Sequence, residues 1–261
     1  MIALQEEALP CHFGRDNELF GLYHAAAGVA TKAVLLCPPL GQDLIRSHRV
    51  YRQLAETLAA GGIATLRFDY YGSGDSAGRS VDVDWVRCVA DIAAAAKELR
   101  SRSGCASVTA FGARLGGNLA IAAAAAAHFA ELIIWDPILD GAAHVARLDA
   151  LQAALRVDPM RFDTPRSAED AAGQWLGFAV SPRLRQQLMQ QSLQSPVVRV
   201  RVLDSLPATE AHDWDRLVTA GATVTTLNPS TMWDELDRLE HAILSPTLIR
   251  TVTEHVGEAR R

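Results

Sequence analysis

Residues 108–117, VTAFGARLGG, decide the fold expected for this chain. Glycines stand two residues before Arg114 and two and three residues after it, between a strand-like run and an apolar helix-like run. Such glycines let a strand and a helix approach closely around one residue with a strained backbone. The pattern is typical of a nucleophile elbow, whose first helical amides can bind negative charge. An enzyme would carry Ser, Cys or Asp at the centre of this turn, whereas this chain carries Arg114.

Strand and helix signals alternate on both sides of this turn. Alternation of this kind predicts an α/β fold with a mostly parallel sheet and helices on both faces. Two further strand-like runs flank a turn at residues 14–17, GRDN, and predict an antiparallel hairpin at one edge, which makes eight strands in all. The predicted strands span 4–12, 18–25, 33–37, 63–69, 107–111, 132–136, 197–203 and 222–227, and the predicted helices span 50–60, 81–99, 115–129, 209–220 and 246–256.

The alternation fails between Asp140 and Ser195. This segment carries three helical runs, at 142–155, 168–178 and 182–193, with no strand signal between them. We expect it to form a helical cap over the carboxyl ends of the strands. The prediction is therefore one domain, with a core of residues 1–139 and 196–261 and a cap of residues 140–195.

Composition excludes several classes of protein. The 261 residues are 49% hydrophobic and 21% charged, which is ordinary for a globular α/β domain. The net charge of −5 argues against a nucleic-acid surface. The longest apolar stretch, 119–135, is interrupted by charged residues, and the first residues lack a basic start and an apolar core, so we expect neither a membrane span nor a secretory signal. Four cysteines without a C-x-x-C pair predict reduced thiols, a cytoplasmic location and no metal or other cofactor.

Four further motifs accompany the turn at Arg114. They are PPLGQ at 38–42, IRSHR at 45–49, LRFDYYGSGDSAG at 66–78 and WDPILDG at 135–141. Together they resemble the α/β-hydrolase superfamily, within it the serine-aminopeptidase-like hydrolases, and in particular the hydrolases encoded beside exosortase A systems. The resemblance runs from about residue 30 to the C-terminus. It implies an α/β-hydrolase fold and action on an ester, thioester or related acyl compound.

The same resemblance implies a base and an acid. His241 lies in a loop five residues ahead of a proline, as the family's base histidine does. Asp204, at the end of a predicted strand, matches the family's acid, but the usual spacing after a glycine is missing. Glu210 and Asp213 therefore remain alternatives, and Asp136 at the end of an earlier strand is another acid that could reach the same site.

The family's anion-binding amides would come from Leu40 or Gly41, and from Leu115. Arg114 has two interpretations beside them. Its guanidinium could hold the carboxylate or phosphate of a ligand. Alternatively, it is a tolerated replacement in an inactive relative, paired with a protein carboxylate such as Asp136 or Asp204. An unpaired buried arginine is costly, so we expect a protein carboxylate against Arg114 in the resting state.

Other nucleophile or binding candidates have weaker support. Ser76 lies in GDSAG at 74–78, which fits G-x-S-x-G, but its loop is not followed directly by a helix. Cys37 ends a strand beside the anion-binding motif, although a buried thiol that fills space is the commoner case. His48 could bind a ligand or lie on a solvated basic helix start. The remaining histidines, His144 among them, are predicted to be surface or helix residues, and none has the spacing of metal ligands.

Three functions follow from these residues. The first is an enzyme without a serine nucleophile, in which His241 activates water while Arg114 and the amides stabilise negative charge. The second is a non-catalytic pseudohydrolase that binds a small acyl or anionic ligand or a partner. The third is a serine hydrolase that uses a non-standard nucleophile such as Ser76. The fold alone does not choose among them.

Overall fold

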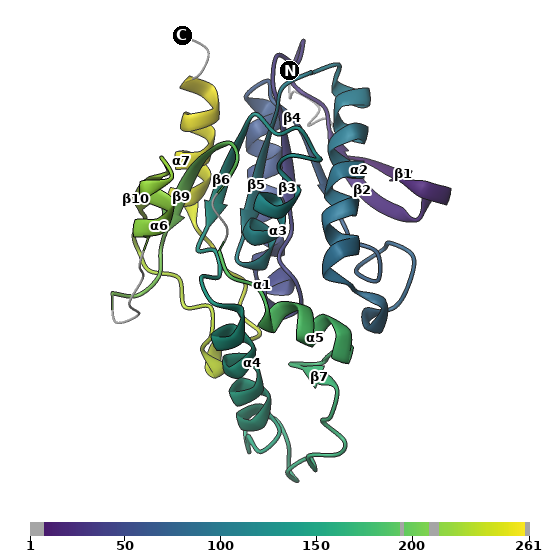
Figure 1. Ribbon diagram of the computed structural model, residues 1–261, viewed down its shortest axis with the longest axis vertical. Helices are drawn as coiled ribbons and strands as arrows, with labels where there is room; N and C mark the ends of the chain where they lie inside the picture. Colours follow the sequence, from purple (N-terminus) through teal and green to yellow (C-terminus); the bar gives the residue numbers. More distant parts are fainter. Residues whose placement is uncertain (1–7, 194–195, 209–213, 259–261) are drawn as a thin grey trace, which may run out of the picture.

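An eight-stranded sheet forms the centre of the computed structural model, which describes residues 8–193, 196–208 and 214–258 (Figure 1). The strand order is β1-β2-β4-β3-β5-β6-β9-β10. The hairpin strands β1 and β2 run antiparallel to their neighbours, and the other strands are parallel, so the predicted mostly parallel sheet is confirmed. The strands are β1 Leu9–Phe13, β2 Leu19–His24, β3 Ala33–Cys37, β4 Ala64–Phe68, β5 Val108–Ala113, β6 Glu131–Trp135, β9 Arg199–Asp204 and β10 Thr223–Thr226.

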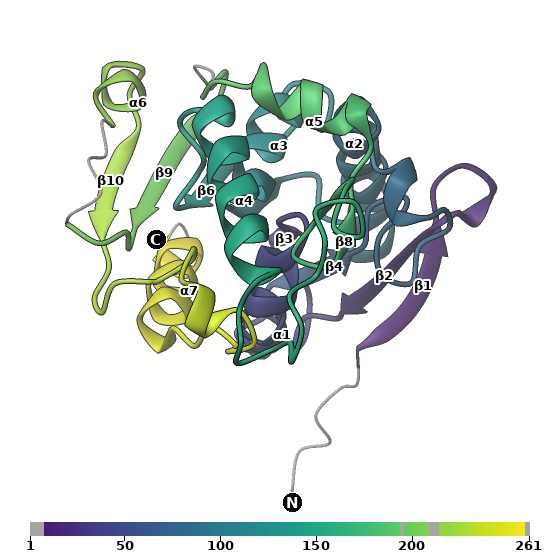
Figure 2. The same ribbon diagram turned by 90° about the horizontal axis from the view of Figure 1, so that it is seen from below.

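Helices cover both faces of the sheet, as the alternation predicts. Figure 2 shows α2 and α3 on one side and α1 and α7 on the other. The α-helices that flank the sheet are α1 Gln42–Ala60, α2 Trp85–Ser103, α3 Leu115–Ala123, α6 Asp215–Thr219 and α7 Pro246–Glu258, and short 3-10 helices lie at η1 Arg15–Asn17, η2 Ser80–Asp82 and η3 Leu236–Arg238. Two hydrophobic clusters result, because successive residues of a strand point to opposite faces. Leu35 of β3 belongs to the cluster with α2 and α3, and Leu36 to the cluster with α1 and α7.

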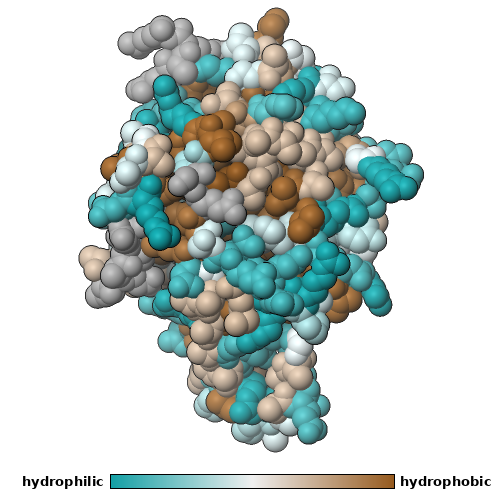
Figure 3. Space-filling view, in the orientation of Figure 1, coloured by the Kyte–Doolittle hydropathy of each residue, from teal (hydrophilic) through white to brown (hydrophobic). Residues whose placement is uncertain are grey.

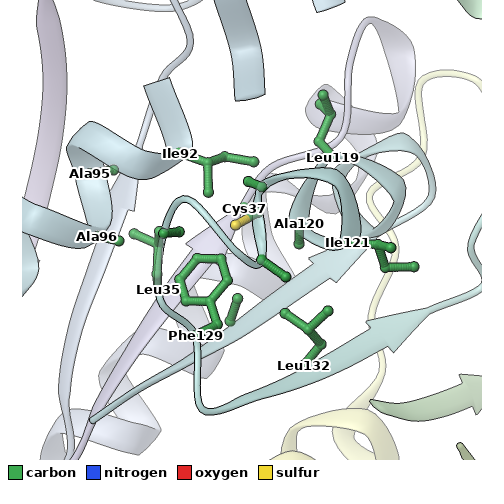
Figure 4. Close-up of a cluster of buried hydrophobic side chains, with 14 of the residues drawn as sticks. Leu35, Cys37, Ile92, Ala95, Ala96, Leu119, Ala120, Ile121, Phe129 and Leu132 are labelled. Carbon is green, nitrogen blue, oxygen red and sulfur yellow. The ribbon is translucent and has the colours of Figure 1, made fainter. Parts of the chain in front are cut away.

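Small side chains let the helices approach the sheet closely. In Figure 4, Leu35 and Cys37 of β3 lie among Ala95 and Ala96 of α2 and Ala120 of α3. All five side chains are fully buried. The high alanine content of the chain thus has a structural use, since it shortens the distance between the elements behind the β5–α3 turn.

Glycines make the closest approach at that turn. A Cβ on Gly112 would lie 2.6 Å from the carbonyl oxygen of Gly116. A Cβ on Gly116 would lie 2.5 Å from the carbonyl oxygens of both Cys37 and Pro38. Backbone atoms cannot move aside as a flexible side chain can. The spacing of these glycines is therefore a packing requirement between β3, β5 and α3.

The segment between β6 and β9 leaves the sheet at the carboxyl ends of its strands, where Figure 1 shows α4 and α5. It contains α4 Gly141–Leu155, the two-residue strands β7 Gln174–Trp175 and β8 Phe178–Ala179, and α5 Pro182–Met189. Two of the three predicted helices are confirmed. The helix predicted over 168–178 is wrong, because turns and the antiparallel β7–β8 hairpin occupy this stretch. Gly173, Leu176 and Gly177 have positive φ values of 66°, 49° and 92°, which an α-helix cannot contain.

Hydrophilic and hydrophobic residues are mixed on the face shown in Figure 3. Within the described ranges, no helix is long and apolar enough to cross a membrane. The four cysteines are buried free thiols.

Replacing Gly116 by alanine tests the packing at the β5–α3 turn. The added Cβ would collide with two carbonyl oxygens, so we expect Gly116→Ala to lower the free energy of unfolding by about 3 kcal/mol or more, as for overpacked cores. Gly257→Ala in α7 is the matched control, since its Cβ meets nothing within 4 Å. That variant should leave stability unchanged or raise it by up to about 1 kcal/mol. Urea unfolding measures both, and equal stability of the two variants would contradict the packing argument.

Candidate ligand-binding site

Arg114 occupies the single residue between β5 and α3. Its backbone has φ 50° and ψ −129°, and its amide donates to the carbonyl oxygen of Trp135 at 2.9 Å. Its side chain is only 6% exposed. The strained turn predicted from the glycine spacing is therefore present, with a buried cation at its centre.

Two carboxylates hold this cation. Nε of Arg114 lies 3.3 Å from Oδ2 of Asp43, and Nη2 lies 3.1 Å from Oδ2 of Asp234. The guanidinium carbon also lies 5.4 Å from the ring centroid of Trp233. The predicted pairing of Arg114 with a protein carboxylate is confirmed, but the partners are Asp43 and Asp234 rather than Asp136 or Asp204.

The two partners come from distant parts of the chain. Asp43 lies in the first turn of α1, and Asp234 lies in the loop between β10 and α7. Asp234 also accepts Nε of Arg147 from α4 at 2.9 Å, so it bridges two guanidinium groups. The sequence did give one signal for Asp43, which is that it directly follows the PPLGQ motif.

Burial and neighbouring charge act in opposite directions in this cluster. Burial alone would lower the pKa of Arg114, but the carboxylates of Asp234 and Asp43 more than offset it, and the pKa is raised. Burial raises the pKa of Asp43 to about 6, although Arg114 acts against this change. Arg114 is therefore charged at every accessible pH, whereas Asp43 gains a proton in mild acid.

A second arginine fixes the loop that carries Asp234. Arg46 of α1 is 3% exposed and donates to the carbonyl oxygens of Trp233, Met232 and His241, the last two at 2.7 and 3.3 Å. A guanidinium that satisfies three carbonyls from one loop holds that loop in a single conformation. The motif IRSHR at 45–49 thus contributes a structural group to the site.

Asp136 has a structural position too. Its buried carboxylate accepts the backbone amide of Ser205 at 2.7 Å, the Ser205 hydroxyl at 2.6 Å and Nε1 of Trp233 at 2.8 Å. Burial raises the pKa of Asp136, and these hydrogen bonds oppose that rise. Asp136 therefore joins the end of β6 to the segment after β9 and to the loop beside Asp234.

A cavity of about 350 Å³ opens next to this cluster. Its walls come from the start of α1, the loop between β4 and α2, α4, the β7–β8 hairpin, α5 and the loop before α7. Most of its lining is apolar, namely Leu40, Leu44, Ile45, Val83, Leu115, Leu148, Leu151, Trp175, Leu176, Phe178, Ala179, Val180, Leu184, Leu188, Trp233 and Leu239. The polar side chains on its walls are Gln42, Asp43, Ser73, Ser80, His144 and Asp234.

His144 is a site residue that sequence reasoning missed. It lies on a helix, as predicted, but it is 7% exposed and lines the cavity. Burial lowers its pKa to about 3, and Arg114 adds to this effect, so the imidazole is neutral. The available signal was the spacing of His144, Leu148 and Leu151, which places all three on one face of α4.

The predicted anion-binding residues lie together at the cavity. Leu40, Gly41 and Leu115 all line it, at the N-termini of α1 and α3. Gly41 has a φ of 61° and begins α1 without a side-chain cap. Binding of an anion by these amides stays a prediction.

The predicted base and acid lie elsewhere. The His241 side chain is exposed and is not among the residues that line the cavity. Oδ2 of Asp204 accepts Nε1 of Trp214 at 2.9 Å, and within the described residues no hydrogen bond joins Asp204 to His241. The alternatives Glu210 and Asp213 lie outside the described residues. No group of three or more potential metal ligands occurs in the part of the chain that the structure describes.

The other candidates also lie away from the cavity lining. The Ser76 hydroxyl donates to the carbonyl oxygen of Asp69 at 2.7 Å and accepts the amide of Phe20 at 2.9 Å, so it fastens its own loop. Cys37 is fully buried, and burial raises the pKa of its thiol. His48 is exposed on α1 beside a separate small hollow, where partial burial lowers its pKa.

Comparisons with known proteins agree with this architecture. The family model of serine aminopeptidase, S33, matches residues 40–176, slightly more than half of the chain. A search of curated proteins gives no significant match. The matching solved structures include XC6422 from Xanthomonas campestris, described as a member of a/b serine hydrolase without lid, at 17% identity and a TM-score of 0.57, covering 98% of this chain and 95% of that one.

Two other solved structures resemble the chain over nearly its whole length. Est1E from Butyrivibrio proteoclasticus has 15% identity and a TM-score of 0.60, covering 97% of this chain and 98% of that one. The bottromycin epimerase BotH has 17% identity and a TM-score of 0.57, covering 98% of this chain and all of the other. At these identities the likeness concerns the fold, and it confirms the predicted α/β-hydrolase fold.

Removing the buried guanidinium of Arg114 should lower the free energy of unfolding much more than removing a partly exposed guanidinium does. Arg114→Gln leaves Asp43 and Asp234 without their shared partner, and we expect the free energy of unfolding to fall by about 3–5 kcal/mol. Arg185→Gln is the control, because Arg185 pairs with Asp149 where both side chains are about two-fifths exposed. That variant should lose at most about 1 kcal/mol. Urea unfolding distinguishes the two, and similar losses would argue against a buried pair.

The buried neutral histidine predicts a pH dependence of stability. His144 has a pKa of about 3 in the folded state, while an unfolded histidine titrates near 6.5. As the pH falls below 6.5, only the unfolded chain takes up this proton, so His144 lowers the free energy of unfolding by about 1.4 kcal/mol per pH unit. Asp43, with a raised pKa of about 6, acts in the opposite sense between pH 6 and 4.

Comparing wild type with His144→Leu isolates this contribution. Urea unfolding at pH 7 and pH 5 should show a smaller loss of stability on acidification in the variant, by about 2 kcal/mol. An identical pH dependence in both proteins would mean that the imidazole is not held neutral.

Proposed function

The chain belongs to the serine aminopeptidase S33 family, and we propose that it is a non-hydrolytic member that binds a small acyl-type molecule in its cavity. One observation carries the proposal. The turn where the family resemblance expects a nucleophile holds Arg114, whose guanidinium is buried and paired with Asp43 and Asp234. A group held in this way is a structural cation and cannot attack a carbonyl carbon.

Neither His144 nor His241 is an effective base at the cavity. A general base works best when its pKa lies near the operating pH, and the pKa of His144 is about 3. The exposed His241 lies outside the cavity lining, which argues against activation of water by that residue. The Ser76 hydroxyl is engaged by backbone groups of Asp69 and Phe20, which argues against a serine hydrolase that uses it.

The lining of the cavity supports an acyl-type ligand. Its volume lies in the range of small-molecule sites, and most of its walls are aliphatic or aromatic with a few polar groups among them. Burial of a hydrocarbon chain against such walls is favourable by about 0.8 kcal/mol per methylene group. Trp175 and Phe178 of the β7–β8 hairpin lie on this wall.

The segment 140–195 serves as the cap in this proposal. Leu148 and Leu151 of α4, the hairpin residues and Leu184 and Leu188 of α5 all line the cavity, so this segment supplies much of its apolar wall. The fold is compatible with functions other than hydrolysis, as the structural likeness to an epimerase illustrates. A cytoplasmic location and association with an exosortase A system rest on the sequence alone and remain predictions.

Two assays on the purified protein test the proposed function. A fluorophosphonate probe should leave it unlabelled, and the uncharged apolar dye Nile red should bind with increased fluorescence. Ala179→Trp places an indole in the cavity and should weaken dye binding at least tenfold, which corresponds to about 1.4 kcal/mol. Ala172→Trp is the control, because this exposed residue lies outside the cavity lining.

Two results would contradict the proposal. Labelling by the probe that is lost in Ser76→Ala would establish a serine hydrolase. Equal dye binding by Ala179→Trp and Ala172→Trp would place the apolar site elsewhere.

A further inference from the structure

The cavity meets the carboxylates of the buried cluster and not its central cation. Asp43 and Asp234 line the cavity, whereas Arg114 is absent from the lining and lies behind them at 3.3 and 3.1 Å. Arg147 approaches Asp234 from α4 at 2.9 Å. A ligand that enters this end of the cavity therefore encounters hydrogen-bond acceptors before it can encounter a guanidinium group.

The cluster has no surplus positive charge to offer an anion. Three guanidinium groups are matched by three carboxyl groups among the described residues around the turn, namely Arg46, Arg114 and Arg147 against Asp43, Asp136 and Asp234. A carboxylate or sulfonate added to this end would face two carboxylates and would lose its hydration. Because the charges of these six side chains already balance, none of them would compensate for that loss.

His144 is the second polar group that points to a ligand. It lines the cavity and is 7% exposed, and in the described part of the chain no hydrogen bond reaches its ring nitrogens. Buried polar side chains are normally hydrogen-bonded. A neutral imidazole has one donor and one acceptor nitrogen, so it can bond a hydroxyl or an amide of a ligand in either direction.

We propose that the cavity selects uncharged molecules that combine an apolar chain with a hydrogen-bond-donating end, such as an alcohol or a primary amide, and rejects anions. Asp43 is the specificity-determining residue, since its carboxylate both accepts from the ligand and screens Arg114. His144 completes the recognition of the polar end. This inference rests on the proposed function, because it names the ligand class of the same cavity.

Displacement of Nile red by three matched probes tests the selectivity. The probes are 1-decanol, methyl nonyl ether and decane-1-sulfonate, which each contain the same number of carbon atoms and differ in donor capacity and charge. We expect 1-decanol to displace the dye at a concentration at least tenfold lower than either of the others. Displacement by the sulfonate at equal or lower concentration than the alcohol would overturn the inference while leaving the proposed function in place. If the dye does not bind, or none of the three probes displaces it, the proposed function itself fails.

Two variants assign the selectivity to residues. Asp43→Asn keeps the shape of the side chain and removes its charge, so the affinity for decane-1-sulfonate should rise at least tenfold. His144→Phe should lower the affinity for 1-decanol several-fold and leave that for methyl nonyl ether unchanged, since Asp43 still accepts from the hydroxyl. Glu131→Gln is the control, since Glu131 pairs with His255 outside the cavity lining, and it should change neither affinity.

The outcomes for the variants are separable. Unchanged sulfonate affinity in folded Asp43→Asn would remove the assignment of Asp43. Unchanged alcohol affinity in His144→Phe would remove that of His144. If Asp43→Asn does not fold, the wild-type probe series and His144→Phe still decide the inference.

Discussion

The ion pairs of Arg114 with Asp43 and Asp234 are the interaction on which the arrangement of the site depends. A guanidinium that is 6% exposed cannot remain unpaired, because the loss of hydration would exceed what the fold can supply. Asp43 lies 71 residues before Arg114 in the chain, and Asp234 lies 120 residues after it. Pairing therefore joins the start of α1 and the loop before α7 to the β5–α3 turn, and residues of all three segments line the cavity.

Arg46 and Asp136 both contact the chain directly before Asp234 and so hold this partner of Arg114 in place. Arg46, three residues after Asp43 on α1, holds the carbonyl oxygens of Met232 and Trp233, directly before Asp234. Asp136 accepts Nε1 of Trp233. Asp234 is thus fixed by its neighbours in the chain as well as by its own ion pairs. The same contacts therefore determine where the Asp234 carboxylate lies in the cavity wall and which charges surround it.

The parts of the structure that local patterns determine could be predicted from the sequence. Glycine spacing gave the turn at Arg114, and strand–helix alternation gave the sheet and most of its helices. The 168–178 segment was misassigned because its composition favours a helix, while Gly173 and Gly177 impose left-handed backbone angles. Only the position of Asp43 directly after the PPLGQ motif pointed to a partner of Arg114, because an ion pair across more than 70 residues leaves no local pattern. His241 was expected in the site from spacing to a proline, which does not report where a side chain points.

Backbone strain at the carboxyl ends of β5 and β6 connects stability to ligand recognition. Arg114 and Asp136 follow these strands with φ values of 50° and 45°, which cost energy for residues with a Cβ. Such conformations persist only where the surroundings over-determine them, and here the ion pairs of Arg114 and the three hydrogen bonds of Asp136 do so. Asp43 and Asp234 therefore serve two purposes, since they hold a strained turn from one side and form the polar wall of the cavity on the other. A ligand that hydrogen-bonds these carboxylates without displacing them leaves the turn intact, whereas an anion that competes for Arg114 would weaken the contacts that maintain it.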